Sequence, residues 1–328
     1  MFEALRMTYL ITGAAGFIGY HCCLALLRRG EPVVGLDNLN PYYSVALKRA
    51  RLDELRRFPE FVFREVDIAS GEALHAALAG ATIDRVIHLA AQPGVRYSLT
   101  NPQAYARANL VGHLNVLEYC RRAEHPPIMV YASSSSVYGG NTKLPFKEDD
   151  RVDQPISLYA ATKRAGELMS HTYAHLYGLR LTGLRFFTVY GPWGRPDMAL
   201  WRFAEAILQG NPIQVFNYGR MRRDFTYVDD IVSGVLAVSD RPPATSPPHA
   251  IYNIGGSRSE DLLHAIAVLE AALGREAKKE LLPMQPGDVA ETLADISAIV
   301  ADYGFMPTTP IEVGIPKFVE WFKIWRRQ

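Results

Sequence analysis

The chain of 328 residues is long enough for one large α/β unit or two closely joined domains, and it can bury a sizeable core. Its 35 Lys and Arg against 34 Asp and Glu leave a net charge of +1 without a basic stripe, so we expect a small-molecule partner and no nucleic acid. The 3 cysteines, the lack of a ~20-residue apolar stretch and the lack of a secretory pattern predict a cytoplasmic protein with core thiols, no metal and no membrane partner. Either Met1 or Met7 could initiate translation.

The first elements form a strand, a glycine-rich turn and a helix. The apolar run 8–12 ends at Gly13, and the segment 20–29 has helical apolar spacing that stops at Gly30. A second apolar strand, 32–36, is followed by Asp37, about twenty residues beyond the glycines. These elements predict a βαβ unit.

The glycine-rich turn has the composition of a dinucleotide site. Gly13, Gly16 and Gly19 permit a tight turn, a close approach of the backbone to a pyrophosphate and packing of helix on strand, while the helix N-terminus attracts the anion. An ordinary tight turn is the alternative, but Asp37 stands where it would bind an adenosine ribose. An acid there, with no arginine in the next few positions, favours the 2′-hydroxyl of NAD over the 2′-phosphate of NADP.

Strands and helices continue to alternate along the chain. We expect helices at 109–122 and around Tyr159, and strands at 61–66, 85–91, 128–132 and 182–185. This order predicts a Rossmann-like, doubly wound parallel sheet with helices on both faces. In such sheets ligands bind outside the carboxyl ends of the strands.

Beyond residue 190 the alternation weakens and Pro and Gly become frequent. We therefore expect an α/β fold with a smaller, mixed α/β substrate-binding domain on the C-terminal side. In this division residues 1–188 form the NAD-binding domain with 229–254 returning to it, and residues 189–228 and 255–328 form the second domain.

Tyr159 and Lys163 lie four residues apart in a predicted helix, so their side chains share one face. A nearby ammonium favours phenolate over phenol, and lowering a tyrosine pKa from about 10 to about 7 takes roughly 4 kcal/mol. The alternative is a chance pair, a half-buried aromatic beside a solvated charge. The motifs elsewhere in the chain decide between the two.

Taken together, the motifs resemble those of the extended short-chain dehydrogenase/reductase family, which includes the nucleotide-sugar epimerases and dehydratases. The resemblance spans nearly the whole length and rests on Gly13–Gly19, His88–Ala91, Ser133–Gly139, Tyr159–Lys163 and Arg223–Asp230. It implies that Tyr159 removes a proton from a sugar hydroxyl, and that Lys163 binds the nicotinamide ribose and lowers the pKa of Tyr159. It also implies that Ser134 bridges the sugar oxygen and Tyr159.

The same resemblance assigns the cofactor site, for which the implied cofactor is NAD. Besides Tyr159 and Lys163, its expected residues are Gly13, Ala15, Gly16, Phe17, Ile18, Gly19, Asp37, Asn38, Asp67, Ile68, Leu89, Ala90, Ala91, Gln92, Asn109 and Phe187.

The residues that are missing indicate which reaction of the family to expect. Its 4,6-dehydratases carry an Asp-Glu pair where this chain has Ser135 and Ser136, and its decarboxylases carry a Glu at the position of Ser136. Oxidation at C4, rotation of the keto sugar and return of the hydride need only the Tyr159 chemistry. The resemblance therefore implies a 4-epimerase, an isomerase in which NAD is regenerated in every cycle.

The expected substrate is a UDP-sugar. Residues 184–199, 92–98 and 284–289 look like signatures of the UDP-glucuronate 4-epimerases, which interconvert UDP-glucuronate and UDP-galacturonate. Pro93 departs from the small residue we expect there, and Thr188 stands where galactose epimerases have Asn. The implied substrate residues are Arg96, Ser134, Ser135, Ser136, Thr188, Arg195, Val215, Phe216, Arg223, Gln285 and Asp288.

Two other functions stay open from the sequence. The chain could be a UDP-glucose or UDP-N-acetylhexosamine 4-epimerase, or a non-catalytic NAD-sensing protein of the same fold. A decarboxylase or dehydratase fits the sequence less well. The helices at 109–122 and 159–177 could pair with those of a second copy in a four-helix homodimer interface, as in the family.

Overall fold

The computed structural model describes residues 6–285 and 288–327. Its centre is a parallel sheet with strand order β10-β6-β5-β4-β1-β2-β3, seven strands within the described residues. The strands are β1 (Tyr9–Thr12), β2 (Val33–Asp37), β3 (Phe61–Glu65), β4 (Arg85–His88), β5 (Ile128–Ser134), β6 (Leu181–Phe186) and β10 (His249–Ile254). This is the doubly wound parallel sheet that the sequence predicts.

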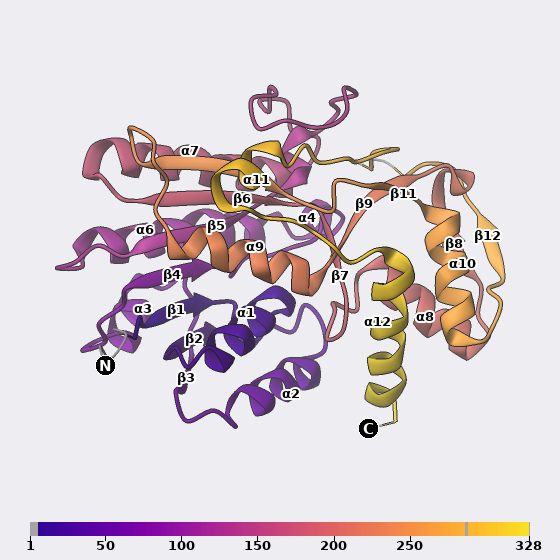
Figure 1. Ribbon diagram of the computed structural model, residues 1–328, viewed down its shortest axis with the longest axis horizontal. Helices are drawn as coiled ribbons and strands as arrows, with labels where there is room; N and C mark the ends of the chain where they lie inside the picture. Colours follow the sequence, from indigo (N-terminus) through magenta and orange to yellow (C-terminus); the bar gives the residue numbers. More distant parts are fainter. Residues whose placement is uncertain (1–5, 286–287, 328) are drawn as a thin grey trace.

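Helices cover both faces of the sheet (Figure 1). On one face lie α1 (Phe17–Arg28), α2 (Val45–Leu55), α9 (Val228–Asp240) and α11 (Ser297–Tyr303). On the other lie α3 (Gly71–Ala77), the π-helical turn η1 (Ala106–Val111), α6 (Gly112–Arg122) and α7 (Leu158–Tyr177), with the short helices α4 (Tyr97–Thr100) and α5 (Pro102–Tyr105) nearby.

Strand alternation explains the two layers of core. Successive side chains of a strand point to opposite faces. Tyr9 and Ile11 accordingly join the apolar cluster under α1 and α9, whereas Leu10 joins the cluster under α3 and α6. Cys22, Cys23 and Cys120 are free thiols buried in these clusters, as the sequence predicts.

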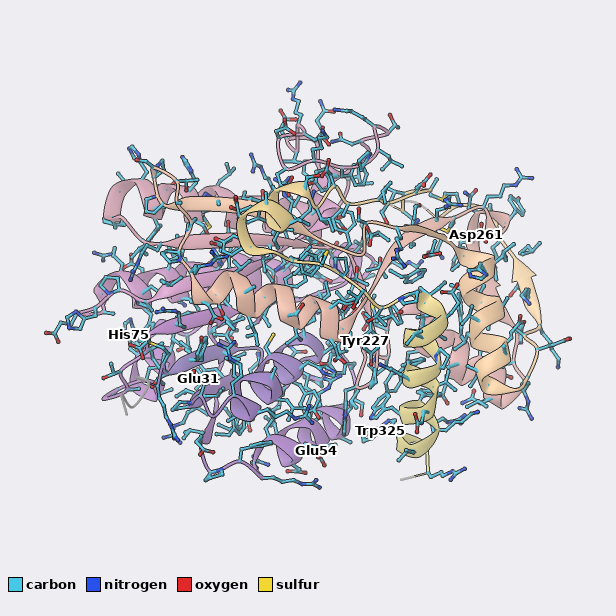
Figure 2. The ribbon with its side chains drawn as sticks, in the orientation of Figure 1. Glu31, Glu54, His75, Tyr227, Asp261 and Trp325 are labelled. Carbon is cyan, nitrogen blue, oxygen red and sulfur yellow. The ribbon has the colours of Figure 1, made fainter. Side chains whose placement is uncertain are left out.

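The segments around β7 and after β10 build a smaller set of sheets and helices beside the main sheet (Figure 1). One sheet has the order β11-β9-β7 and the other pairs β12 with β8. The elements are β7 (Thr188–Tyr190), α8 (Ala199–Gln209), β8 (Ile213–Val215), η3 (Phe216–Gly219), β9 (Arg222–Tyr227), β11 (Ser259–Asp261), α10 (Leu262–Leu273), β12 (Lys279–Leu281) and α12 (Ile311–Trp325). Figure 2 adds the side chains and labels Tyr227 and Trp325 near the junction with the main sheet.

The structure differs from the sequence prediction at several element boundaries. Helix α1 begins at Phe17 rather than residue 20, because its first turn includes the last glycine of the turn. Strand β5 runs to Ser134 rather than stopping at residue 132, because Ser133 and Ser134 pair with β6. Strand β4 ends at His88, and Asn109 lies in the π-helical turn that precedes α6.

No helix in the described part of the chain combines the length and the apolar character needed to cross a membrane. Three positions named in the sequence analysis, the initiator Met1 and residues 286 and 287 of the 284–289 signature, lie outside the described residues.

Candidate active site

The glycine-rich turn between β1 and α1 requires glycine for steric reasons. Gly13 has φ +75°, and a Cβ on it would lie 2.8 Å from the backbone nitrogen of Ala90. A Cβ on Gly19 would lie 2.0 Å from the carbonyl oxygen of Gly13. Gly16 is the N-cap of α1 and provides no side-chain cap, so the first backbone N–H groups of the helix are available to an anion.

Asp37 connects this turn to the end of β2. Its carboxylate is buried and accepts hydrogen bonds from the backbone N–H groups of Leu39 (2.8 Å) and Ala15 (3.2 Å). Lys48 of α2 is also buried and places its ammonium 3.4 Å from the same carboxylate. Sequence reasoning missed Lys48 because it considered only the positions directly after Asp37, whereas α2 folds back over the strand end.

The other predicted cofactor residues follow β3 and β4. Asp67 accepts a hydrogen bond from the N–H of Ala69 (2.9 Å) and pairs with Arg107 (3.0 Å), while Asn38 is exposed. Asn109 accepts from the N–H of Gln92 (2.7 Å) and donates to Gln92 O (3.1 Å) and to the Thr162 hydroxyl (3.0 Å). Asn109 thereby ties the loop after β4 to α7. Leu89, Ala90 and Ala91 lie in this loop, Ile68 is buried beside it, and Phe187 is buried after β6.

These residues fit an NAD molecule on two observations. The glycines form a cradle that a Cβ would fill, at a helix N-terminus suited to a pyrophosphate. Asp37 presents a carboxylate at the end of β2, the strand next to β1, where a dinucleotide-binding fold needs an acid for the adenosine ribose. A group of three or more His, Cys, Asp or Glu suited to a metal ion does not occur among residues 6–285 and 288–327.

Tyr159 and Lys163 stand one turn apart near the start of α7, which Ser157 caps by accepting a hydrogen bond from the N–H of Ala160 (3.1 Å). Lys163 is buried and donates to the carbonyl oxygen of Ala132 (2.8 Å) at the end of β5. Burial lowers the pKa of Lys163 to about 8, while Glu167 raises it. The ammonium is therefore held between the helix and the strand that carries the serines.

The pKa of Tyr159 differs from the sequence-based expectation. Burial raises it, and the Ser134 hydroxyl and the Arg195 guanidinium oppose that rise. Asp197 adds to the rise, so the pKa of Tyr159 lies above its ordinary value, and Lys163, whose ammonium donates to Ala132 O, is not among the groups that shift it.

The serines after β5 form a small hydroxyl cluster. The Ser134 hydroxyl is 3.1 Å from that of Ser136 and accepts a hydrogen bond from the N–H of Ser136 (3.2 Å). The segment Ser135–Tyr138 (η2) is a short 3₁₀ turn that keeps Ser135 and Ser136 half-buried. Thr188, also half-buried, begins β7 just beyond the end of β6, the strand that pairs with β5.

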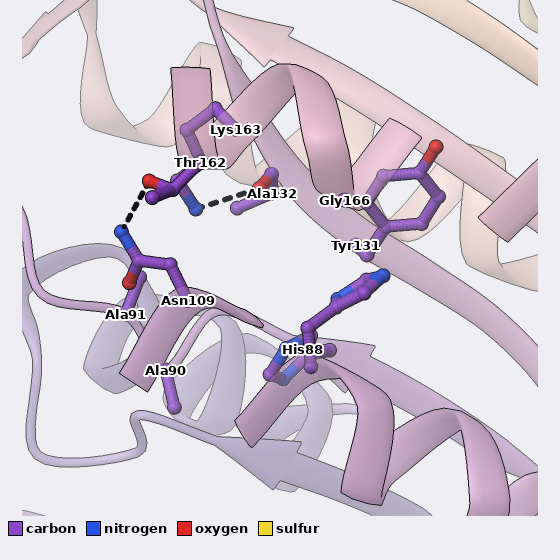
Figure 3. A pocket seen from close by; sticks show the side chains of 10 residues that line it. His88, Ala90, Ala91, Asn109, Tyr131, Ala132, Thr162, Lys163 and Gly166 are labelled. Carbon is purple, nitrogen blue, oxygen red and sulfur yellow. Dashed lines mark hydrogen bonds between the residues drawn. The ribbon is translucent and has the colours of Figure 1, made fainter. Parts of the chain in front are cut away.

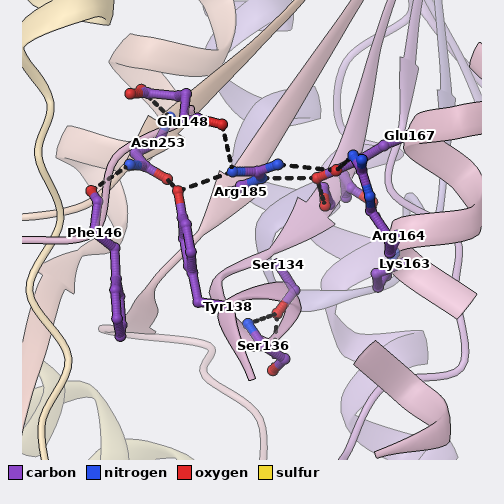
Figure 4. A network of polar contacts seen from close by, with 12 residues as sticks. Ser134, Ser136, Tyr138, Phe146, Glu148, Lys163, Arg164, Glu167, Arg185 and Asn253 are labelled. Carbon is purple, nitrogen blue, oxygen red and sulfur yellow. Dashed lines mark hydrogen bonds and ion pairs between the residues drawn. The ribbon is translucent and has the colours of Figure 1, made fainter. Parts of the chain in front are cut away.

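Behind the serines lies a buried polar network, shown in Figure 4. The Glu167 carboxylate accepts hydrogen bonds from the Ser133 hydroxyl (2.6 Å), from Arg164 (2.8 Å) and from Arg185 Nε (2.8 Å) and Nη2 (3.0 Å). Glu167 and Arg185 are 0% and 1% exposed. Burial raises the pKa of Glu167, but Arg185, Ser133 and Arg164 lower it by more, so the carboxylate is charged.

The network continues from Arg185 to the C-terminal segments. Arg185 donates to the Tyr138 hydroxyl (3.0 Å), which donates to Asn253 Oδ1 (2.6 Å). The Asn253 amide donates to the carbonyls of Phe146 (2.9 Å) and Asp295 (3.0 Å). The ends of β5, β6 and β10 and the helix α7 are thus braced against one another next to Ser134.

A small cavity lies on the other side of Lys163 (Figure 3). Its lining includes His88, Asn109, His113, Thr162 and Lys163. Burial lowers the pKa of His113 to about 3 and that of His88 well below its ordinary value, so both rings are neutral at pH 7. Among the residues that line this cavity, Lys163 is consequently the one that carries a positive charge.

The two arginines expected at the pyrophosphate lie in the segments of the smaller sheets. Arg195 forms an ion pair with Asp197, whose carboxylate also accepts from the Tyr42 hydroxyl (3.1 Å). Arg223 pairs with Asp288 (2.8 Å). Both expected pyrophosphate ligands therefore already have a carboxylate partner.

The expected uracil residues lie near one of the expected arginines. Arg96 stacks its guanidinium over the Phe216 ring at 5.3 Å, and Val215 next to it is buried. The carbonyl oxygen of Gln285 accepts from the N–H of Asp288 (3.3 Å). Arg96 and Phe216 are thus brought together from the loop after β4 and the smaller sheets.

The chain matches a known family in sequence and in structure. Residues 9–255 match the model of the NAD dependent epimerase/dehydratase family. The chain is 48% identical over 329 residues to UDP-glucuronate 4-epimerase 4 of Arabidopsis thaliana, covering 96% of this chain and 75% of that protein. It is 46% identical over 331 residues to a probable UDP-glucuronate 4-epimerase of Rhizobium meliloti (strain 1021), covering 96% and 97%.

Among solved structures, the UDP-glucuronic acid 4-epimerase from Bacillus cereus, crystallised with UDP-glucuronic acid and NAD, superposes with a TM-score of 0.89. That protein is 34% identical, and the match covers 97% of this chain and 100% of that chain.

Proposed function

Because the chain belongs to the NAD dependent epimerase/dehydratase family, we propose that it is an NAD-dependent 4-epimerase that interconverts UDP-glucuronate and UDP-galacturonate. The observation that carries the proposal is the grouping at one sheet edge of Tyr159, Lys163 and Ser134 with the neutral hydroxyls of Ser135, Ser136 and Thr188. The first three residues would serve the proton transfer that accompanies hydride exchange with NAD, and the others supply no acid or base for a further step.

In the proposed mechanism Tyr159 takes the proton from the sugar 4-hydroxyl and later returns it, with Ser134 donating to the same oxygen. Lys163, anchored to Ala132, would bind the nicotinamide ribose, and its positive charge would favour the phenolate form of Tyr159. Bound NAD supplies the hydride acceptor and donor. The proton taken from the 4-hydroxyl would stay on Tyr159 while the keto sugar rotates and then return to the same oxygen, so the reaction neither takes up nor releases a proton overall.

The hydroxyls of Ser135, Ser136 and Thr188 are proposed to hold the sugar carboxylate. A 4-keto uronate is a β-keto acid, and it loses CO₂ easily when its carboxylate is desolvated and aligned with the carbonyl. Neutral hydrogen bonds stabilise the carboxylate against that loss. Arg195 and Arg223 would bind the diphosphate, with Asp197 and Asp288 keeping the guanidinium forks oriented beforehand.

We further propose that residues 1–188 with 229–254 form the NAD-binding domain, and that residues 189–228 and 255–328 form the nucleotide-sugar-binding domain. Arg96, Val215, Phe216, Gln285 and Asp288 would then contact the uridine. The free, buried thiols support a cytoplasmic location, where such thiols stay reduced.

The test is a product assay on the purified protein. Incubation with UDP-glucuronate should yield UDP-galacturonate, measured by anion-exchange chromatography, and Tyr159→Phe should slow the reaction about 10³-fold or more. Turnover of UDP-glucose without turnover of UDP-glucuronate would instead identify a neutral-hexose epimerase.

A homodimer through η1, α6 and α7 is also part of the proposal. These helices expose Val111 (46%), Leu168 (53%) and Leu176 (60%), large apolar side chains on one side of the main sheet. A second copy paired through the same helices would cover them in a four-helix interface. Leu168→Asp combined with Leu176→Asp should convert a dimer into a monomer in light scattering, whereas Leu281→Asp, at a side chain 52% exposed on β12, should not.

A further inference from the structure

Arg51 of α2 is a buried cation that contacts two loops far apart in the sequence. Its side chain is 0% exposed. Nη1 donates to the carbonyl oxygen of Ala15 (2.8 Å) and to the Tyr43 hydroxyl (2.9 Å). Nη2 donates to the carbonyl oxygens of Trp193 (2.6 Å) and Gly194 (2.9 Å). One guanidinium therefore spans the glycine-rich turn and the loop 191–197.

The backbone carbonyls that accept hydrogen bonds from Arg51 belong to two segments, and each segment directly precedes a proposed ligand-binding group. Ala15 comes before the N-cap Gly16, so its carbonyl sets the orientation of the peptide that opens α1. Trp193 and Gly194 come before Arg195, the proposed substrate ligand that also acts on Tyr159. A planar fork fixes the direction of each carbonyl more strictly than an ammonium would.

The charge of Arg51 is not balanced by an acidic side chain in the described part of the chain. No carboxylate among the described residues forms an ion pair with Arg51, and the Nε–H group of Arg51 has no hydrogen-bond partner there. A guanidinium remains charged in proteins, and a buried charge without a counter-ion is costly. The diphosphates expected on both sides of Arg51 are anions that would offset this cost.

The loop 191–197 has a strained conformation, and the hydrogen bonds from Arg51 help to hold it. Trp193 has φ +58°, a left-handed backbone that a bulky residue rarely adopts. The loop is also fastened to the cofactor half at its two ends, where His21 Nε2 lies 2.9 Å from Pro192 O and Tyr42 donates to Asp197. Arg51 holds the strained middle of the loop and, through Ala15, the cofactor turn as well.

We propose that Arg51 is a positioning residue that couples the cofactor site to the substrate site, so that each ligand is bound more tightly when the other is present. The proposal rests on the function proposed above for the glycine-rich turn and for Arg195. Because coupling is reciprocal, a diphosphate on the substrate side retains the cofactor and the cofactor strengthens diphosphate binding.

The experiment measures cofactor exchange in the holoenzyme. Isotopically labelled NAD is added, and replacement of the bound NAD is followed by mass spectrometry with and without saturating UDP. In the wild-type protein UDP should slow the exchange about tenfold, and in Arg51→Met it should slow it less than twofold. The dissociation constant of UDP, measured by calorimetry on the holoenzyme, should rise about tenfold in Arg51→Met, which corresponds to about 1.4 kcal/mol.

Lys48→Met is the matched control, because Lys48 lies one turn before Arg51 on α2 and contacts Asp37 on the cofactor side. Lys48→Met should speed NAD exchange, but UDP should still slow the exchange about tenfold in this variant. A role for Arg51 confined to stability would lower the melting temperature without changing that ratio.

If Arg51→Met does not fold, the same exchange measurement is made on Arg51→Lys, because a single ammonium cannot donate to the carbonyls of both loops. The coupling is supported if UDP slows NAD exchange in this variant by at most half the factor measured for the wild-type protein. An unchanged ratio in the folded variant, or no effect of UDP on exchange in the wild type, overturns it. The readout uses UDP without a sugar, so a failure to epimerise UDP-glucuronate would leave this result intact.

Discussion

Replacing Glu167 with Gln tests whether the buried network behind the serines holds the active site together. Glu167 is completely buried and is the carboxylate partner of Arg185, which is also buried. Gln keeps the volume and one acceptor oxygen, but its amide nitrogen would face a guanidinium N–H group. Removing one partner of a buried ion pair costs about 3–5 kcal/mol because the other charge is left uncompensated.

For a chain of this size about 3 kcal/mol corresponds to a fall of roughly 4 °C or more in melting temperature. We expect this fall for Glu167→Gln at pH 7, measured by circular dichroism and checked by urea unfolding. The double variant Glu167→Met with Arg185→Met should lose less than the sum of the two single variants, since neither charge is then unpaired.

The matched control is Asp153→Asn, which removes a carboxylate from a pair with Arg151 whose side chains are 51% and 78% exposed. That pair contributes ~0–1 kcal/mol, so the melting temperature should change by about 2 °C or less. A melting temperature for Glu167→Gln as close to the wild type as that of Asp153→Asn would refute the reasoning.

Three further predictions concern pH, product and cofactor. Burial lowers the pKa of His113 to about 3, so the unfolded chain binds a proton below pH 6.5 that the folded protein does not. His113 should therefore contribute about 2 kcal/mol to the fall in the free energy of unfolding from pH 6.5 to pH 5, and the fall should be smaller by this amount in urea titrations of His113→Asn. Ser136→Glu places an acid beside Ser134 and should raise decarboxylation, seen as CO₂ and a pentose nucleotide; absence of both above the wild-type level would contradict the proposed role of the hydroxyl. Asp37→Asn leaves the Lys48 ammonium without its carboxylate partner, and a 2′-phosphate can take the place of that carboxylate. Fluorescence titration should therefore show that the affinity for NADP relative to NAD rises ~10-fold or more. An unchanged ratio of the two affinities would show that Lys48 does not face the ribose.

The parts of the site that follow directly from local sequence were predictable. The strand, glycine turn and helix at 9–28 and the acid at Asp37 depend on neighbours within one βαβ unit, and the structure has them in that form. The core thiols follow from their apolar helical surroundings. In each case the interactions that decide the structure are close in sequence.

The residues that brace the site were not predictable in the same way. Arg51 contacts a loop 142 and 143 residues away, and Glu167 contacts Arg185 on a strand 18 residues later. Charged residues in a helical pattern are expected at the surface, and these are buried because each finds acceptors or donors contributed by other elements. One signal was present for Glu167, since it continues the four-residue spacing of Tyr159 and Lys163 on α7.

The buried cations of the site share a way of acting that bears on catalysis. Lys163 donates to Ala132, Arg51 to Ala15, Trp193 and Gly194, and Arg185 to Glu148. Lys163 and Arg51 thus fix backbone carbonyls of segments that lead to Ser134, to Arg195 and to the glycine turn. Arg185 fixes the carbonyl of Glu148 in the loop between η2 and α7. Loops fixed in advance lose little conformational entropy on binding, so binding energy is available to orient the sugar for hydride transfer. Rotation of the keto sugar between its two faces then has to be accommodated by the sugar and by the neutral hydroxyls proposed to hold its carboxylate, because the charged side chains around them are already engaged in hydrogen bonds.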